Sequence, residues 1–238
     1  MRQGRAALLL AGMAVAGAGP DYAALMAEAE WDWRPGDLIF FNDLTPRDAL
    51  IRRAEGGSWE SVGILRASSG DPRVVYAGEQ AGVTEAILYE ITDSRAPDGY
   101  AIWRIRNTAA AAEGVGLMMN YLLLSAYDSP FDDRMLFGNG QFYNAELPFE
   151  AALSAGHVIA RPQRIGDLVA MDGPLAQAIL ADWQAHPYCV AALTAGECWQ
   201  ELRDIAIITP GALLSSGALE QVWPRPGPDS ASPPANGQ

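Results

Sequence analysis

The amino-acid sequence predicts an α+β fold, and the order of its segments is the main reason. Strand-like runs gather between residues 37 and 106, where apolar stretches are separated by turn clusters such as "SSGDP" at 68–72 and "SRAPDG" at 94–99. Helix-like segments dominate after residue 109, and no internal repeat is present. Strands that come before helices, rather than alternating with them, favour a small antiparallel sheet packed against helices.

The first half of the chain supplies the expected sheet. A short helix over 21–33 is broken by the "RPG" at 34–36, and the helix that follows has Thr45 as its N-cap, Pro46 at its first position and Gly56–Gly57 at its end. Strands are expected over 37–41, 61–67, 73–79, 82–91 and 100–106.

The second half supplies the helices. They are expected over 109–127, 142–156 and 174–186, and Pro148 forces the second to start late or to kink. The loop 128–140 between the first two contains Asp132 and Asp133, which lack metal-ligand spacing and are expected to be solvated. The Pro/Ser/Gly-rich tail 224–238 is predicted to be disordered.

The N-terminus predicts export. Arg2 and Arg5 precede a short apolar run and small residues, which is typical of a signal peptide over 1–19, so one domain is expected over 20–223 in a periplasmic or secreted protein. No other stretch is long and apolar enough to span a membrane once this segment is removed. An uncleaved anchor or a buried helix is the alternative for this segment.

Charge and composition exclude several functions. The net charge is −13, and the 16 basic residues are all arginine. Nucleic acid is therefore not expected as a partner, because phosphate binding needs clustered positive charge. Without lysine, Schiff-base chemistry is impossible. No cofactor is expected.

The sequence contains two cysteines, Cys189 and Cys198. In an oxidising compartment, such an isolated pair is a disulfide candidate. Two buried free thiols are the alternative, and a metal site is poorly supported because His186 is the only additional ligand close in sequence.

Several ordered segments resemble one known family. "RPGDLIFF", "DALIRRAEG", "SVGIL" and "FYNAEL", together with the late "ITPGALLSSGALEQVW", are similar to the YiiX-type permuted papain-like proteins of the broad NlpC-type cysteine hydrolase group. The resemblance runs from about residue 31 to 223. It implies a circularly permuted papain-like fold, with a β-barrel-like sheet on helices and a histidine strand that precedes the nucleophile helix. It also implies hydrolysis of an amide or acyl bond by a Cys–His pair.

The chemistry that this resemblance implies is missing from the expected positions. Asn144 stands at the cysteine position, Ser61 at the histidine position and Tyr76 at the position of the orienting acid. A carboxamide is not a nucleophile, and serine attacks only with a base beside it. Asn144 is also a favourable residue for a helix cap.

We therefore expect a non-catalytic pseudoenzyme that binds a peptide-, glycan- or acyl-like ligand or a cell-envelope protein. Two alternatives remain open: an active hydrolase with Ser61 as nucleophile and Glu79 or a histidine as base, and a scaffold for assembly. His157 is expected at a turn or the surface. The side chains expected to bind the ligand or shape the cleft are Trp59, Glu79, Asp128, Phe131, Tyr143 and Glu146.

Overall fold

A computed structural model describes residues 33–42, 44–92, 99–106 and 111–224. The expected signal peptide (1–19), nearly all of the expected helix at 21–33 and nearly all of the C-terminal tail lie outside these residues. In the part of the chain that is described, no helix has both the length and the apolar character that a bilayer crossing requires.

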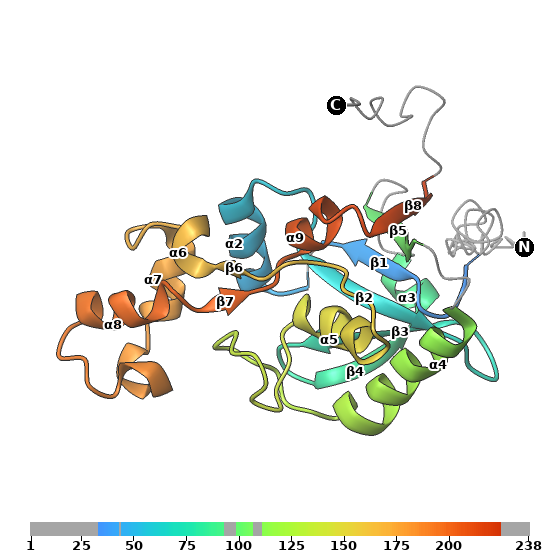
Figure 1. Cartoon of the computed structure of the whole chain (residues 1–238), viewed down its shortest axis with the longest axis horizontal. Helices are drawn as coiled ribbons and strands as arrows, with labels where there is room; N and C mark the ends of the chain where they lie inside the picture. Colours follow the sequence, from blue (N-terminus) through green and yellow to red (C-terminus); the bar gives the residue numbers. More distant parts are fainter. Residues whose placement is uncertain (1–32, 43, 93–98, 107–110, 225–238) are drawn as a thin grey trace, which may run out of the picture.

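The centre of the molecule is a six-stranded antiparallel sheet with the order β4-β3-β2-β1-β5-β8 (Figure 1). β1 pairs with both β2 and β5, so that Phe41 is opposite Ser61 on one side and Tyr100 on the other. The described strands do not close into a barrel, because β4 and β8 form the two edges. The strands are β1 (Leu38–Phe41), β2 (Ser61–Arg66), β3 (Arg73–Gly78), β4 (Gly82–Ile87), β5 (Tyr100–Ile105) and β8 (Leu219–Trp223).

Both faces of this sheet are buried, and alternate residues of each strand supply two apolar clusters. Leu38 and Phe40 of β1 belong to the larger cluster, which the main helices cover, whereas Ile39 and Phe41 belong to the smaller one. This alternation follows from the two-residue period of a strand. The fold is therefore α+β, with helices gathered mainly on one face.

Helix α2 (Pro46–Glu55) begins and ends as the sequence predicts. The Thr45 side chain accepts a hydrogen bond from the backbone N–H of Asp48, and Gly56 ends the helix in the left-handed region at φ 64°. Pro46 occupies the first helical position, where a backbone N–H would have no acceptor within the helix, so proline loses no hydrogen bond there.

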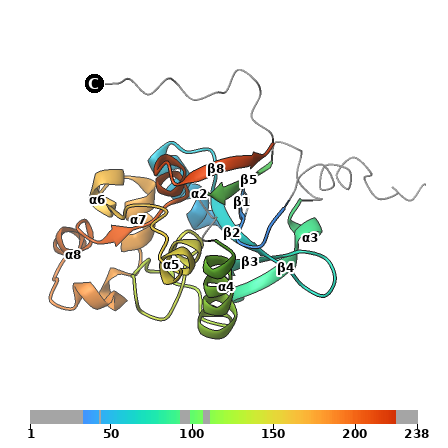
Figure 2. The ribbon, with the colours of Figure 1, turned by 45° about the vertical axis from the view of Figure 1, so that its right-hand side comes forward.

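Helices α4 (Ala111–Tyr121) and α5 (Glu146–Ser154) pack against each other beside the sheet (Figure 2). A π-helical segment, Leu122–Ala126, continues α4. A second group lies at one end of the molecule and contains α6 (Ile165–Leu168), α7 (Pro174–Leu180) and α8 (Ala195–Leu202), with a two-stranded sheet of β6 (Gln163–Arg164) and β7 (Ala206–Ile207) beside it. The short helix α9 (Pro210–Ser215) precedes β8.

Three expected elements are shorter than predicted. The strand expected over 82–91 ends at Ile87 and is followed by helix α3 (Leu88–Thr92), whose residues Leu88 and Ile91 cover the smaller apolar cluster. The helix expected over 174–186 ends at Leu180 and gives way to two 3₁₀ turns, Trp183–Ala185 and Pro187–Cys189. Helix α5 starts late, at Glu146, as Pro148 requires. Pro148 therefore lies in the first turn, where a backbone N–H would have no acceptor within the helix, and no hydrogen bond is lost.

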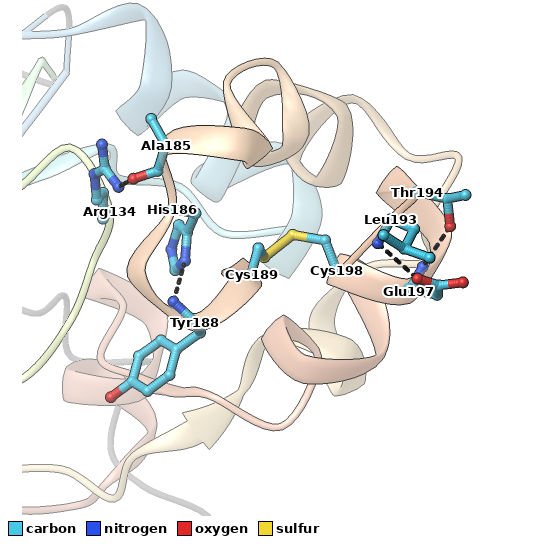
Figure 3. Close-up of a disulfide and its surroundings, with 9 residues drawn as sticks. All are labelled: Arg134, Ala185, His186, Tyr188, Cys189, Leu193, Thr194, Glu197 and Cys198. Carbon is cyan, nitrogen blue, oxygen red and sulfur yellow. Dashed lines mark hydrogen bonds between the residues drawn. A yellow bond between two sulfur atoms is a disulfide. The ribbon is translucent and has the colours of Figure 1, made fainter. Parts of the chain in front are cut away.

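Cys189 and Cys198 form a disulfide, as expected (Figure 3). The bond joins the second 3₁₀ turn to α8, which Thr194 caps by accepting a hydrogen bond from the backbone N–H of Glu197. Both cysteines are buried. The bond therefore fixes the end of the molecule that contains α6, α7 and α8.

Candidate functional site

The structure brings Ser61 and Asn144 together at a third residue, Asp48. The Ser61 hydroxyl donates to Asp48 Oδ2 at 3.3 Å, and the Asn144 side chain lies beside this carboxylate and favours its ionised form. Asn144 Nδ2 donates in addition to the backbone carbonyl of Glu60, at 3.2 Å. Ser61 is 0% exposed, and Asp48 and Asn144 are each 1% exposed. We call Asp48, Ser61 and Asn144 the buried polar cluster.

Three elements position the buried polar cluster. Asp48 lies in the first turn of α2, where the Thr45 cap holds its backbone; Ser61 begins β2; and Asn144 lies just before α5. Burial raises the pKa of Asp48 to about 6, against hydrogen bonds from Thr45, Asn144 and Ser61 that favour the carboxylate. At neutral pH the carboxyl is mostly ionised, so it accepts hydrogen bonds and can take up a proton.

Asn144 does not cap α5. The residue at the cap position is Ala145, and no side chain bonds the free N–H groups there. Instead, the Asn144 amide nitrogen donates to the backbone carbonyl of Glu60, while its Oδ1 is buried without a hydrogen-bond partner among the described residues. An acceptor left in this state destabilises a protein by about 1–3 kcal/mol unless a donor reaches it.

Tyr76 and Glu79 do not join the buried polar cluster. Tyr76 lies in β3 on the other face of the sheet, where its ring packs edge-to-face on Phe41 with centroids 6.5 Å apart. Glu79 is exposed in the turn between β3 and β4. The acid beside Ser61 is thus Asp48 of α2 rather than a residue of β3.

Four of the five other residues expected to bind a ligand or shape a cleft are mostly structural in this conformation. Tyr143 is 2% exposed, and its hydroxyl accepts a hydrogen bond from the backbone N–H of Ile208 at 2.7 Å. Trp59 and Phe131 are partly buried against the main apolar cluster. Asp128 is exposed at φ 61°, and its backbone N–H donates to Val83.

Glu146 is a second buried acid close to this region. It is 0% exposed, its Oε2 accepts from the backbone N–H of Tyr143 at 3.4 Å, and its Oε1 has no hydrogen-bond partner among the described residues. Burial first, then the carboxylates of Glu150 and Asp132, raise its pKa to about 9. Glu146 is therefore protonated at neutral pH, which suits an acid at a helix start that no cation accompanies.

Asp132 is not solvated, contrary to the sequence-based expectation. It is 0% exposed and accepts hydrogen bonds from the backbone N–H groups of Arg134 and Leu136 and from the Asn139 side chain. These bonds organise the loop that leads to α5. Asp133, its neighbour, is exposed.

Neither histidine contacts the buried polar cluster. His157 follows α5 and packs so closely on α4 that a Cβ at Gly114 would lie 2.7 Å from its Nε2. His186 is buried near Arg134, and its Nδ1 accepts from the backbone N–H of Tyr188 at 3.3 Å (Figure 3). Among the described residues, no three His, Cys, Asp or Glu side chains are grouped closely enough to hold a metal ion.

Comparison with known proteins identifies the fold. The crystal structure of the metalloprotein YiiX from Escherichia coli O157:H7 matches 81% of this chain and 97% of its own, with a TM-score of 0.62 and 18% sequence identity. The chain has a YiiX-like fold. No protein-family model matches the chain, and no curated protein matches it.

The YiiX-like fold explains why β2 and the start of α5 meet. Ser61 and Asn144 are 83 positions apart in the sequence, yet β2 packs against α5 and both side chains reach Asp48. Sequence reasoning missed Asp48, although the cap residue Thr45 three positions earlier pointed to this helix turn. The sequence does contain a usable signal, because Asp48 is an acid in the first turn of the helix that precedes the strand beginning with Ser61.

The chemistry open to this arrangement is limited. Both cysteines of the chain are in the disulfide, so no thiol is available as a nucleophile. The Ser61–Asp48 distance of 3.3 Å is long for an O–H donor to a carboxylate. In this conformation the Ser61 hydroxyl is engaged by Asp48 and the Asn144 amide nitrogen by the Glu60 carbonyl.

Proposed function

We propose that this chain is an exported, catalytically silent protein with a YiiX-like fold, which binds a ligand bearing amide or hydroxyl donors, such as a peptide, a glycan or an acyl-amide, or a cell-envelope protein. The observation that supports the silent state most is the buried polar cluster. The positions that resemblance assigns to the cysteine and histidine hold Asn144 and Ser61, which bond Asp48 and are closed to solvent.

Binding is supported by the unpartnered Oδ1 of Asn144. This oxygen accepts hydrogen bonds, and a peptide or acyl-amide N–H, or a sugar hydroxyl, is the donor that would satisfy it. Because Asn144 is 1% exposed, a ligand reaches it only after a local opening of the segments around α5. Ligand affinity then includes the free energy of that opening.

The test measures hydrolysis and binding on the same preparation. Panels of amide and ester substrates should give no turnover above that of Ser61→Ala, and a fluorophosphonate probe should not label Ser61. Disaccharide-peptide fragments of peptidoglycan or N-acyl amino acids should raise the melting temperature of the native protein. Asn144→Ala should remove this stabilisation, while the exposed control Ser58→Ala should keep it.

Co-purification with a single envelope protein, without any small-ligand effect, would favour the partner over the small ligand. If neither a fragment nor a partner binds, the binding half of the proposal is wrong. A further variant tests what the site retains: Asn144→Cys combined with Ser61→His should regain weak hydrolysis if opening exposes the pair. A folded but inactive double variant would show that the cleft itself has been rebuilt.

A second candidate function has one specific observation in its favour. Asp48, with its pKa raised to about 6, is hydrogen-bonded to Ser61 and can act as a general base near neutral pH. Asn144 would then donate from Nδ2 to an oxyanion. This hydrolase requires turnover that is lost in both Ser61→Ala and Asp48→Asn, with a rate that rises through about pH 6, and labelling of Ser61 by the fluorophosphonate.

A further inference from the structure

A separate cavity of about 150 Å³ lies between α2, the loop before α5 and the disulfide-linked end of the molecule. Its charged and polar lining consists of Arg47, Asp133, Arg134, Asp182 and His186. None of Asp48, Ser61 and Asn144 lines this cavity. Whatever it binds is therefore independent of the function proposed for the buried polar cluster.

One guanidinium N–H group in the lining of this cavity has no acceptor among the described residues. Arg47 occupies the second position of α2, and its Nη1 is buried with no hydrogen-bond acceptor among the described residues. Guanidinium groups present paired N–H donors that match the two oxygens of a carboxylate. A buried guanidinium N–H without an acceptor is destabilising, and an anionic ligand would both accept from it and offset its charge.

Arg134 is the second arginine in the lining of this cavity, and backbone contacts hold it in place. Its backbone N–H donates to the buried Asp132, and its guanidinium donates through Nη1 to the carbonyl of Ala185, next to His186 (Figure 3). Its Nε lies 3.7 Å from Asp133 Oδ1, which is a loose ion pair. The backbone contacts leave part of the Arg134 charge available to a ligand.

The rim of the cavity has the opposite charge. Asp133 and Asp182 are both exposed, whereas Arg47 Nη1 and His186 are buried. Ile179 adds an apolar wall. A ligand with a carboxylate at one end and an ammonium at the other would place each charge beside its opposite, and the cavity volume suits a small molecule rather than a polymer.

We propose that this cavity binds a small zwitterion of the α-amino acid class, with its carboxylate against Arg47 and Arg134 and its ammonium toward Asp133 and Asp182. His186 contributes a donor from Nε2, because its Nδ1 already accepts from Tyr188. A short aliphatic side chain would lie against Ile179.

The experiment is calorimetric titration of the purified full chain at pH 7.5 with glycine, L-alanine, acetate, methylammonium and inorganic phosphate. Glycine and L-alanine should bind, acetate should bind more weakly, and methylammonium should not bind. Arg47→Met should weaken glycine binding about tenfold or more, because one partner of a buried charge pair is lost. The matched control Arg53→Met, which alters an exposed arginine of the same helix, should bind as the native protein does.

Two further variants separate the ends of the ligand. Asp133→Asn with Asp182→Asn removes only exposed charges, so the fold is retained and the preference for glycine over acetate should disappear. Arg47→Lys keeps the positive charge but lacks the paired N–H donors of the guanidinium, so it should bind glycine better than Arg47→Met does. If Arg47→Met does not fold, Arg47→Lys still tests the role of the guanidinium. Asn144→Ala should leave glycine affinity unchanged, so failure here is distinct from failure of the function proposed above.

Four results would overturn the proposal. The first three are the absence of binding by both glycine and acetate, equal affinities in Arg47→Met and Arg53→Met, and tighter binding of phosphate than of glycine. The fourth is equal binding of glycine and acetate to the native chain, which would rule out the ammonium subsite and therefore the amino-acid class.

Discussion

At the scale of single residues, the identities of Asn144 and Ser61 decide how this site is interpreted. The sequence resemblance predicts a thiol and an imidazole at these two positions, and here a carboxamide and a hydroxyl lie beside the carboxylate of Asp48. Each of these groups makes hydrogen bonds well and exchanges protons poorly near neutral pH, except Asp48. The chemistry that remains is thus concentrated in one carboxyl group.

Asp48→Asn tests how strongly this carboxyl is coupled to folding. Burial raises its pKa from 3.8 to about 6. Between these two pH values the carboxyl is therefore protonated in the folded state and ionised in the unfolded state. Stability from this group therefore falls as pH rises from about 4 to 6 and is level above that, a change on the order of 3 kcal/mol.

Urea unfolding at pH 4, 6 and 8 should show this change in the native protein and a smaller one in Asp48→Asn. The exposed control Asp71→Asn should keep the native slope. An Asp48→Asn variant with the native pH dependence would mean that Asp48 is not the titrating group.

At the scale of elements, helix α2 links the sequence signals to the site, because the turn that Thr45 caps also carries Asp48. Its C-terminal end offers a clean test. Gly56 adopts φ 64°, and a Cβ there would meet no atom within 4 Å, so only backbone strain opposes a side chain. Gly56→Ala should cost about 1 kcal/mol of unfolding free energy.

Gly70 is the matched control, because it also has open space around a built Cβ but no positive φ. Gly70→Ala should be neutral or slightly stabilising, since it restricts the unfolded chain. Equal effects of the two substitutions in chemical denaturation would contradict the assignment of strain to Gly56.

The elements also show what the sequence could and could not predict. Apolar alternation located β1 to β5, and cap residues located α2. The run 82–91 misled because its last four residues continue the apolar pattern of the strand, yet fold as part of α3 over the smaller cluster. Tyr76 was placed with the site by the resemblance, which puts an orienting acid on this strand. Alternation could not correct this, because both faces of the sheet are buried and the pattern does not tell which face a residue takes. Asp48 was missed because its partners, Ser61 and Asn144, come from other elements.

The disulfide supplies a second prediction at this scale. It closes a loop with a sequence separation of 9, and in the chain-entropy model such a loop contributes roughly 2.5–3 kcal/mol. Replacing both Cys189 and Cys198 by alanine should lower the unfolding free energy by about this amount. A loss below about 0.5 kcal/mol would indicate that this end of the molecule is held by packing instead. Mass spectrometry of material from the cell envelope should find the pair oxidised.

At the scale of the whole molecule, acidity is the dominant property. The net charge is −13, and burial raises the pKa values of Asp37, Asp48, Glu55, Asp132 and Glu146 in the folded state. A folded protein that binds more protons than its unfolded chain loses stability as pH rises. Self-repulsion of the negative charge acts in the same direction. We therefore expect stability to fall between pH 5 and 9.

Glu146 should account for much of this fall, because burial and then the neighbouring carboxylates of Glu150 and Asp132 raise its pKa from 4.5 to about 9. The shift corresponds to roughly 6 kcal/mol as an upper bound, spread over the range between the two values. Calorimetry at intervals from pH 5 to 9 should show a falling melting temperature for the native chain and a flatter profile for Glu146→Gln, whose amide matches the protonated acid in shape. Glu201→Gln, an exposed control, should keep the native profile. The melting temperature could instead rise toward pH 9, or it could depend on pH as steeply in Glu146→Gln as in the native chain. Either result would mean that Glu146 is ionised in the folded protein and paired with a cation.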